Sequence, residues 1–179
     1  MKQLTIFCAC LLSLTIAAQH NKHKHSFYLQ GGYRSSLFIK ENGGHHLVSE
    51  TESHQHKCIV FNTGVLFYAA QNWRVGASFT YDHFGTKHRS VEHSNLSYLL
   101  RCDRVWKEKS RYLLYSGLML GVRKTRRFEE EKETGRQTAP AYHVCLIGAE
   151  YKLMNRVFID VNAGYGVAGI VSIGAKFRF

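Results

Sequence analysis

Histidine is the residue type whose distribution most clearly suggests chemistry in this chain. The sequence contains 11 histidines among 179 residues. Most of those beyond the first 25 residues fall in two segments that we predict to be loops: His45, His46, His54, His56, His83, His88 and His93. Neutral imidazole binds Zn²⁺, Cu²⁺ and haem iron, so His45, His46, His54 and His56 are candidate metal ligands. Their spacing matches no defined site, and a solvated polar loop is the alternative interpretation.

A second group, His143, Cys145 and Glu150, has the residue types of an acyl hydrolase. Such an enzyme needs a nucleophile, a base and an orienting carboxylate within hydrogen-bond reach of one another. Alternation along residues 141–152 predicts that His143 and Cys145 lie on the apolar face of a strand and Glu150 on the opposite face. We therefore predict no catalytic residue and no bound cofactor.

A basic block followed by an acidic one is the third notable feature. Arg123, Lys124, Arg126 and Arg127 precede four glutamates within residues 129–133. Arginine binds phosphate as a planar bidentate donor, so the four basic residues predict contact with a phosphate-bearing partner. The whole chain has a net charge of +11. Its charges are dispersed along the chain, and the sequence contains no motif that recognises nucleic acid, so we do not expect nucleic-acid binding.

The amino terminus predicts export. Met1-Lys2-Gln3 precedes an apolar run from Leu4 to Ala18, which is too short for a spanning helix and ends at a plausible cleavage site. We interpret residues 1–18 as a cleavable signal peptide, 19–25 as a short leader and 26–179 as one domain. Beyond the signal peptide, the odd number of cysteines (Cys58, Cys102 and Cys145) predicts no disulfide framework.

Alternation of apolar and polar residues predicts eight strands in the remaining chain. The clearest example sets Trp73, Val75, Ala77, Phe79 and Tyr81 against the polar or small residues between them. The predicted strands cover about residues 27–38, 58–69, 73–83, 95–106, 111–123, 141–152, 156–165 and 170–179. Short connections near 71–72, 107–110 and 153–155 alternate with long ones near 40–57, 84–94 and 124–140. A soluble, lipocalin-like barrel with its apolar faces inward is the competing interpretation.

With these strands, and with Ala175-Lys176-Phe177-Arg178-Phe179 as its last residues, the chain resembles the small eight-stranded outer-membrane β-barrel proteins. That family includes OmpX and the transmembrane domain of OmpA. The resemblance implies an all-β, antiparallel, up-and-down transmembrane β-barrel in the bacterial outer membrane, with short turns in the periplasm and long loops outside. It also implies that Phe177 and Phe179 belong to the signal read by the barrel assembly machinery. The lipid A deacylases among these barrels use His, Ser and Glu, which His143, Cys145 and Glu150 match poorly.

The function expected on this basis is a structural or surface-interaction role. The interior of an eight-stranded barrel is just wide enough for side chains to fill, so we expect lumenal charges to plug it. The expected lumenal charges are Arg34, Arg74, Asp82, Arg101, Asp103, Glu150, Asp160, Lys176 and Arg178. Expected partners are outer-membrane lipid, lipopolysaccharide at Arg123, Lys124, Arg126 and Arg127, and an extracellular ligand or host surface; we expect a monomer. Alternatives are a surface metal- or haem-binding protein and a lipid A-modifying enzyme.

Overall fold

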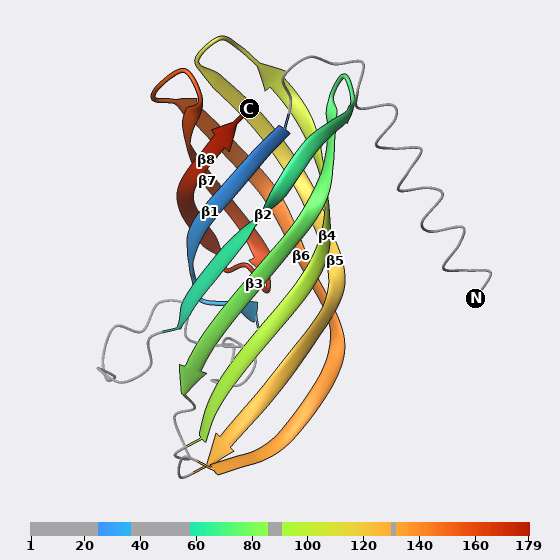
Figure 1. The fold of residues 1–179 in the computed structure, drawn as a ribbon, viewed down its shortest axis with the longest axis vertical. Helices are drawn as coiled ribbons and strands as arrows, with labels where there is room; N and C mark the ends of the chain where they lie inside the picture. Colours follow the sequence, from blue (N-terminus) through green and yellow to red (C-terminus); the bar gives the residue numbers. More distant parts are fainter. Residues whose placement is uncertain (1–24, 37–57, 86–90, 130–131) are drawn as a thin grey trace, which may run out of the picture.

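The computed structural model describes residues 25–36, 58–85, 91–129 and 132–179, which form a closed antiparallel barrel (Figure 1). Each strand pairs with the next, and β8 pairs with β1 to close the sheet. The strands are β1 (His25–Tyr33), β2 (Ile59–Ala70), β3 (Trp73–Gly85), β4 (Val91–Glu108), β5 (Tyr112–Glu129), β6 (Lys132–Lys152), β7 (Val157–Gly166) and β8 (Val171–Arg178). The predicted eight-stranded fold is confirmed. The described residues include no helix that is long and apolar enough to cross a membrane.

The two faces of the sheet have opposite polarity, and the polar face is the buried one. On β3, Trp73 and Tyr81 are exposed, whereas Arg74, Ser78 and Asp82 are buried. The same arrangement recurs around the barrel, where large apolar side chains cover the exterior and charged and polar side chains share the interior with buried aromatic and aliphatic ones. A lipocalin-like barrel would show the reverse, so the soluble alternative is excluded. An apolar exterior around a polar interior is the pattern of a transmembrane β-barrel.

The β2–β3, β4–β5 and β6–β7 connections and the carboxy terminus lie at one end of the barrel, together with the start of β1, whereas the short β7–β8 connection lies at the other end (Figure 1). The short turns are at residues 71–72, 109–111 and 153–156, as predicted. Two of the predicted long loops, 84–94 and 124–140, are strand instead wherever the structure describes them. The third, 40–57, lies outside the described residues.

Strands β4, β5 and β6 therefore continue far beyond the length that a membrane crossing needs. They contain 18, 18 and 21 residues, whereas about 9–11 residues suffice for a tilted crossing. Their outer halves are polar on both faces, so the apolar alternation that identifies a strand is missing there although the β4–β5 and β5–β6 ladders continue. In Figure 1 these strands extend past the rest of the barrel, and the β5–β6 hairpin reaches furthest. We call the part of this hairpin between residues 123 and 140 the ribbon.

A β-bulge in β6 changes which residues face the lumen. The register with β5 and β7 shifts between Cys145 and Ile147, so one extra residue is inserted there. Leu146 and Ile147 are consecutive, yet both are exposed. Alternation is reset at this point, because a bulge places two residues opposite one on the neighbouring strand.

The lumen is packed so closely that one strand position accepts only glycine. Gly148 on β6 pairs directly with Tyr115 on β5, and a Cβ added to Gly148 would lie 2.1 Å from Cζ of the Tyr115 ring. The ring is held in place, since its hydroxyl donates a 2.8 Å hydrogen bond to Asp160 and Arg74 stacks on it at 4.6 Å. The ring therefore has little freedom to move aside.

We predict that Gly148→Ala destabilises the barrel by about 1–3 kcal/mol, the usual cost of overpacking a filled interior. Urea unfolding in detergent, followed by tryptophan fluorescence and by heat-modifiable gel migration, measures the change. Gly31→Ala is the matched control, because a Cβ at Gly31 meets no atom within 4 Å. Equal unfolding midpoints for the two variants would contradict the packing described here.

Candidate functional site

The lumen contains a network of buried charges on five strands, β3, β4, β6, β7 and β8. Arg74 donates from Nη2 to Oδ2 of Asp103 at 2.9 Å and from Nη1 to Glu150. Arg101 donates from Nε to Oδ1 of Asp103 at 2.9 Å. Acids and bases are interspersed, so each buried carboxylate of the network has at least one cationic partner.

Glu150 is the residue on which most of these interactions converge. Lys176 lies 2.6 Å from its Oε1, and Arg178 donates to its Oε2 at 2.7 Å, in addition to the bond from Arg74. Lys176 also lies 2.8 Å from Oδ2 of Asp160. The side chains of Glu150, Asp160 and Lys176 are fully buried. These contacts connect strands that are not neighbours in the sheet, since β3 reaches β6 and β6 reaches β8.

Most of the predicted lumenal charges are in this interior, with one exception. Asp82 is buried near the end of β3, apart from the network described above, which contains seven of the others. Arg34 instead follows the last residue of β1 in a left-handed conformation, and its guanidinium stacks on the exposed Tyr33 ring at 4.9 Å. Its prediction as a lumenal charge is wrong, because β1 ends one residue before it.

The predicted orientation of His143 and Cys145 is also wrong. Both are buried in the lumen, on the same face of β6 as Glu150, because the bulge after Cys145 resets the alternation. The three side chains nevertheless form no nucleophile–base–carboxylate arrangement within the described residues. Glu150 is fully engaged by Arg74, Lys176 and Arg178, and no hydrogen bond joins it to His143.

The ribbon separates the four basic residues of the phosphate-binding prediction onto two faces. Lys124 and Arg126 continue the outward row of Leu120 and Val122, which are exposed. Arg123 and Arg127 occupy the alternate positions, on the face that continues the lumen. The sequence correctly identified a cationic segment but placed it in a loop, where faces cannot be assigned.

One further pair stabilises the ribbon locally. Arg136 donates from Nη2 to Oε2 of Glu133 at 3.1 Å and from Nε to Oε1, and these hydrogen bonds hold the pKa of Glu133 below its usual value. On the inner face, Thr125 donates to Oδ1 of Asn95 at 2.6 Å, which ties β5 to β4. Within the described ribbon, Lys124 and Arg126 take part in no ion pair.

The ribbon also has an open edge. Pairing of β6 with β7 ends at His143 and Gly166, so no described strand pairs with the β7-facing side of residues 132–141. Val167 donates to the carbonyl of Tyr142, which shows that the backbone of Tyr142 faces this side. By alternation, the backbones of Arg136, Thr138 and Pro140 face it too. Proline is tolerated on edge strands because no ladder hydrogen bond is needed there.

The structure tests the functional prediction neither for the loop histidines nor for the terminal aromatic residues. His45, His46, His54 and His56 lie outside the described residues, so metal binding stays a prediction. The described part of the chain contains no group of three or more His, Cys, Asp or Glu side chains that could hold a metal ion. Phe177 is exposed on the outer face of β8, where it pairs with Phe27, and Phe179 is exposed and bonded through its backbone to His25. Recognition of these two residues by the barrel assembly machinery also stays a prediction.

The strand number, closure and polarity define the class of fold as the small eight-stranded outer-membrane β-barrel, as the sequence predicted. Among solved structures, the chain is similar to Neisserial surface protein A, with a TM-score of 0.56, 16% identity, and coverage of 88% of this chain and 96% of that one. It is also similar to the N-terminal β-barrel domain of Pseudomonas aeruginosa OprF (TM-score 0.54, 13% identity, 88% and 100% coverage). The attachment invasion locus protein Ail of Yersinia pestis gives a TM-score of 0.50 at 16% identity, with 88% and 97% coverage. No protein-family model and no curated protein matches the sequence.

We predict that Glu150→Gln destabilises the barrel by about 3–5 kcal/mol, the cost of removing one partner from a buried charge pair. The variant leaves Arg74, Lys176 and Arg178 without their shared carboxylate. Urea unfolding in detergent measures the loss. Glu133→Gln breaks an exposed ion pair on the ribbon and should leave the midpoint nearly unchanged. Similar midpoints for the two variants would show that Glu150 does not hold the lumen together.

Proposed function

We propose that this chain is a bacterial outer-membrane barrel whose ribbon serves a surface-interaction role. The main support for this proposal is that the β5–β6 hairpin extends beyond the barrel and that one of its edges is unpaired among the described strands. The chain is exported through the periplasm after removal of residues 1–18, and the short turns and the carboxy terminus face the periplasm. The ribbon then projects from the cell surface. Neisserial surface protein A and Ail have the same fold, and the proposal assigns this chain to the same general kind of protein.

The chemistry of the ribbon favours an extended peptide as the partner. An unpaired strand edge offers backbone donors and acceptors that a second strand can complete, and the partner's alternate side chains provide specificity. The N–H groups of Arg136 and Thr138 and the carbonyl of Pro140 are the groups available on this edge by alternation. Exposed positive charge on Lys124 and Arg126 would favour partners that carry acidic groups.

For the barrel itself we propose a plugged lumen without a transport role. Eight strands enclose an interior that side chains can fill, and the network around Glu150 occupies it. Phe177 and Phe179 contribute to recognition by the barrel assembly machinery, and the protein acts as a monomer.

We predict that the purified barrel gives no steady conductance in planar lipid bilayers, because the ion-paired side chains of the lumen leave no continuous water path. Single-channel recording on the full chain measures this, with a larger porin as the positive control. Reproducible conductance steps from the folded, heat-modifiable species would contradict the plugged lumen.

We predict that Thr138→Pro reduces attachment of intact cells that display the protein to surfaces coated with an unstructured acidic polypeptide, relative to albumin. The substitution removes one edge N–H without removing a hydrogen bond to β5. Thr138→Val keeps the N–H and is the matched control. Cysteine labelling at position 134 in intact cells first establishes that the ribbon is outside. Equal attachment by all variants, with increased detergent sensitivity of cells lacking the protein, would favour a structural role instead.

A further inference from the structure

A groove of about 530 Å³ crosses the exterior of the barrel on strands β1 to β5. The groove is almost wholly apolar, and it lies where the barrel faces lipid. It is lined by residues that include Phe27, Val65, Ala77, Phe79, Tyr98 and Leu120.

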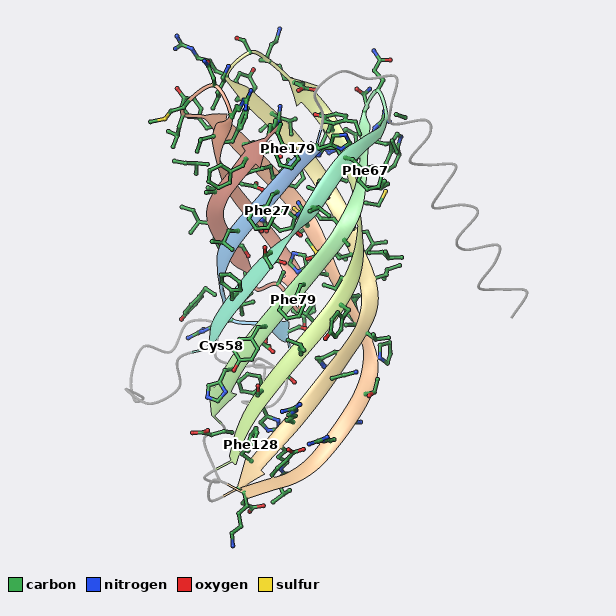
Figure 2. All side chains as sticks on the ribbon, viewed as in Figure 1. Phe27, Cys58, Phe67, Phe79, Phe128 and Phe179 are labelled. Carbon is green, nitrogen blue, oxygen red and sulfur yellow. The ribbon has the colours of Figure 1, made fainter. Side chains whose placement is uncertain are left out.

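The groove exists because a small residue lies among large ones. Ala77 faces outward and pairs with Val65 on β2 and Leu100 on β4. On one side, the rings of Phe79 and Tyr98 meet edge to face at 5.5 Å and form a wall. Figure 2 shows Phe27 and Phe79 at different heights on this exterior. A larger side chain at position 77 would fill the space.

The groove is continuous with the cationic end of the outward face. Val122 lines the groove and pairs with Tyr98. Lys124 and Arg126 are the next two outward residues on β5, at steps of roughly 7 Å along the strand. Both are exposed. An apolar surface therefore passes directly into two cations on the same strand.

Among the described residues neither cation has an ion-pair partner, although Glu133 lies near enough to Arg126 for a weaker electrostatic interaction. Arg136, which pairs with Arg126 across the ribbon, is bonded to Glu133. The carboxylate of Glu92 lies 3.8 Å from His83 and pairs opposite Phe128, one outward step further from the groove than Arg126. Within the described residues, no acid intervenes between the groove and Arg126.

We infer that this face binds a phosphorylated glycolipid of the outer leaflet, namely lipopolysaccharide through its lipid A. An acyl chain lies in the groove at Ala77, and a phosphate is bound by Lys124 and Arg126. The inference rests on the proposed outward orientation of the ribbon, which brings these cations to the outer surface of the membrane. Lysine provides a point charge and arginine a bidentate donor, a combination suited to the phosphate monoesters of lipid A, whose charge no cation within the same headgroup offsets, as it does in a zwitterionic phospholipid.

Strand alternation supplies a strict control for this site. Arg123 and Arg127 have the same charge and lie on the same strand, but on the face that continues the lumen. If the site lies on the outward face of β5, binding requires Lys124 and Arg126 specifically. If the basic segment is attracted to anionic lipid only in a general way, binding depends on the number of positive charges and not on the face that carries them.

The test titrates the purified full chain in detergent with lipid A, dephosphorylated lipid A and phosphatidylglycerol, and measures retained lipid by native mass spectrometry. Lys124→Gln with Arg126→Gln should weaken lipid A binding about 25-fold, at about fivefold per charge, and leave binding of dephosphorylated lipid A unchanged. Ala77→Phe should weaken both lipid A forms. Arg123→Gln with Arg127→Gln should change neither. Heat-modifiable migration confirms that each variant is folded.

Three outcomes would overturn the inference. Equal losses from the outward and inward double variants would mean that charge number, not face, determines binding. Unchanged binding in Ala77→Phe would remove the groove from the site. Equal binding of phosphatidylglycerol and lipid A would indicate annular lipid only. A ribbon that labels from the periplasm contradicts the proposed function, whereas a surface-labelled ribbon with face-independent lipid binding contradicts the glycolipid site alone.

Discussion

Closure of the hydrogen-bonded ladder is the constraint on which the rest of this structure depends. Hydrocarbon offers no hydrogen bonds, so a sheet that spans a membrane must satisfy every backbone N–H and C=O internally. Pairing of β8 with β1 over Ser26–Tyr33 achieves this. Once the sheet is closed, alternation sends one set of side chains to lipid and the other to the narrow interior of an eight-stranded barrel. The charged residues of that interior must then neutralise one another, which accounts for the cluster around Glu150.

Closure extends only as far as the shortest strands, and the exposed features of the molecule begin where it stops. β7 ends at Gly166 and β8 begins at Val171, whereas β4, β5 and β6 continue. Beyond His143, the edge of β6 loses its described partner, and the outward face of β5 changes from apolar to cationic within one step, from Val122 to Lys124. Figure 2 shows Phe128 near the end of the long strands and Phe179 at the opposite end of the barrel.

The sequence predicts those parts of the fold in which one face is apolar. Period-two alternation identifies all eight strands, and it assigns Arg74, Asp103 and Lys176 correctly to the lumen. The outer halves of β4 to β6 are missed because both of their faces carry mostly polar residues, so strand pairing there leaves no hydropathy signal. The orientation of His143 is missed for a different reason. A bulge adds one residue without a required sequence marker, and Leu146-Ile147 is equally apolar in either phase.

The alternation of side chains between the two faces of β5 also determines which partners the basic segment can bind. Composition alone and the structure lead to different expectations for this binding. Four cations in a loop would form one diffuse positive cloud, and any anionic surface would attract it. Four cations on a strand form two rows that point in opposite directions, and only the row of Lys124 and Arg126 is continuous with the apolar exterior. A ligand with adjoining acyl and phosphate groups matches the order of surfaces on that row. Arg123 and Arg127 lie across the same backbone and cannot join it, because rotating them outward would shift the register of β5 against β4 and β6.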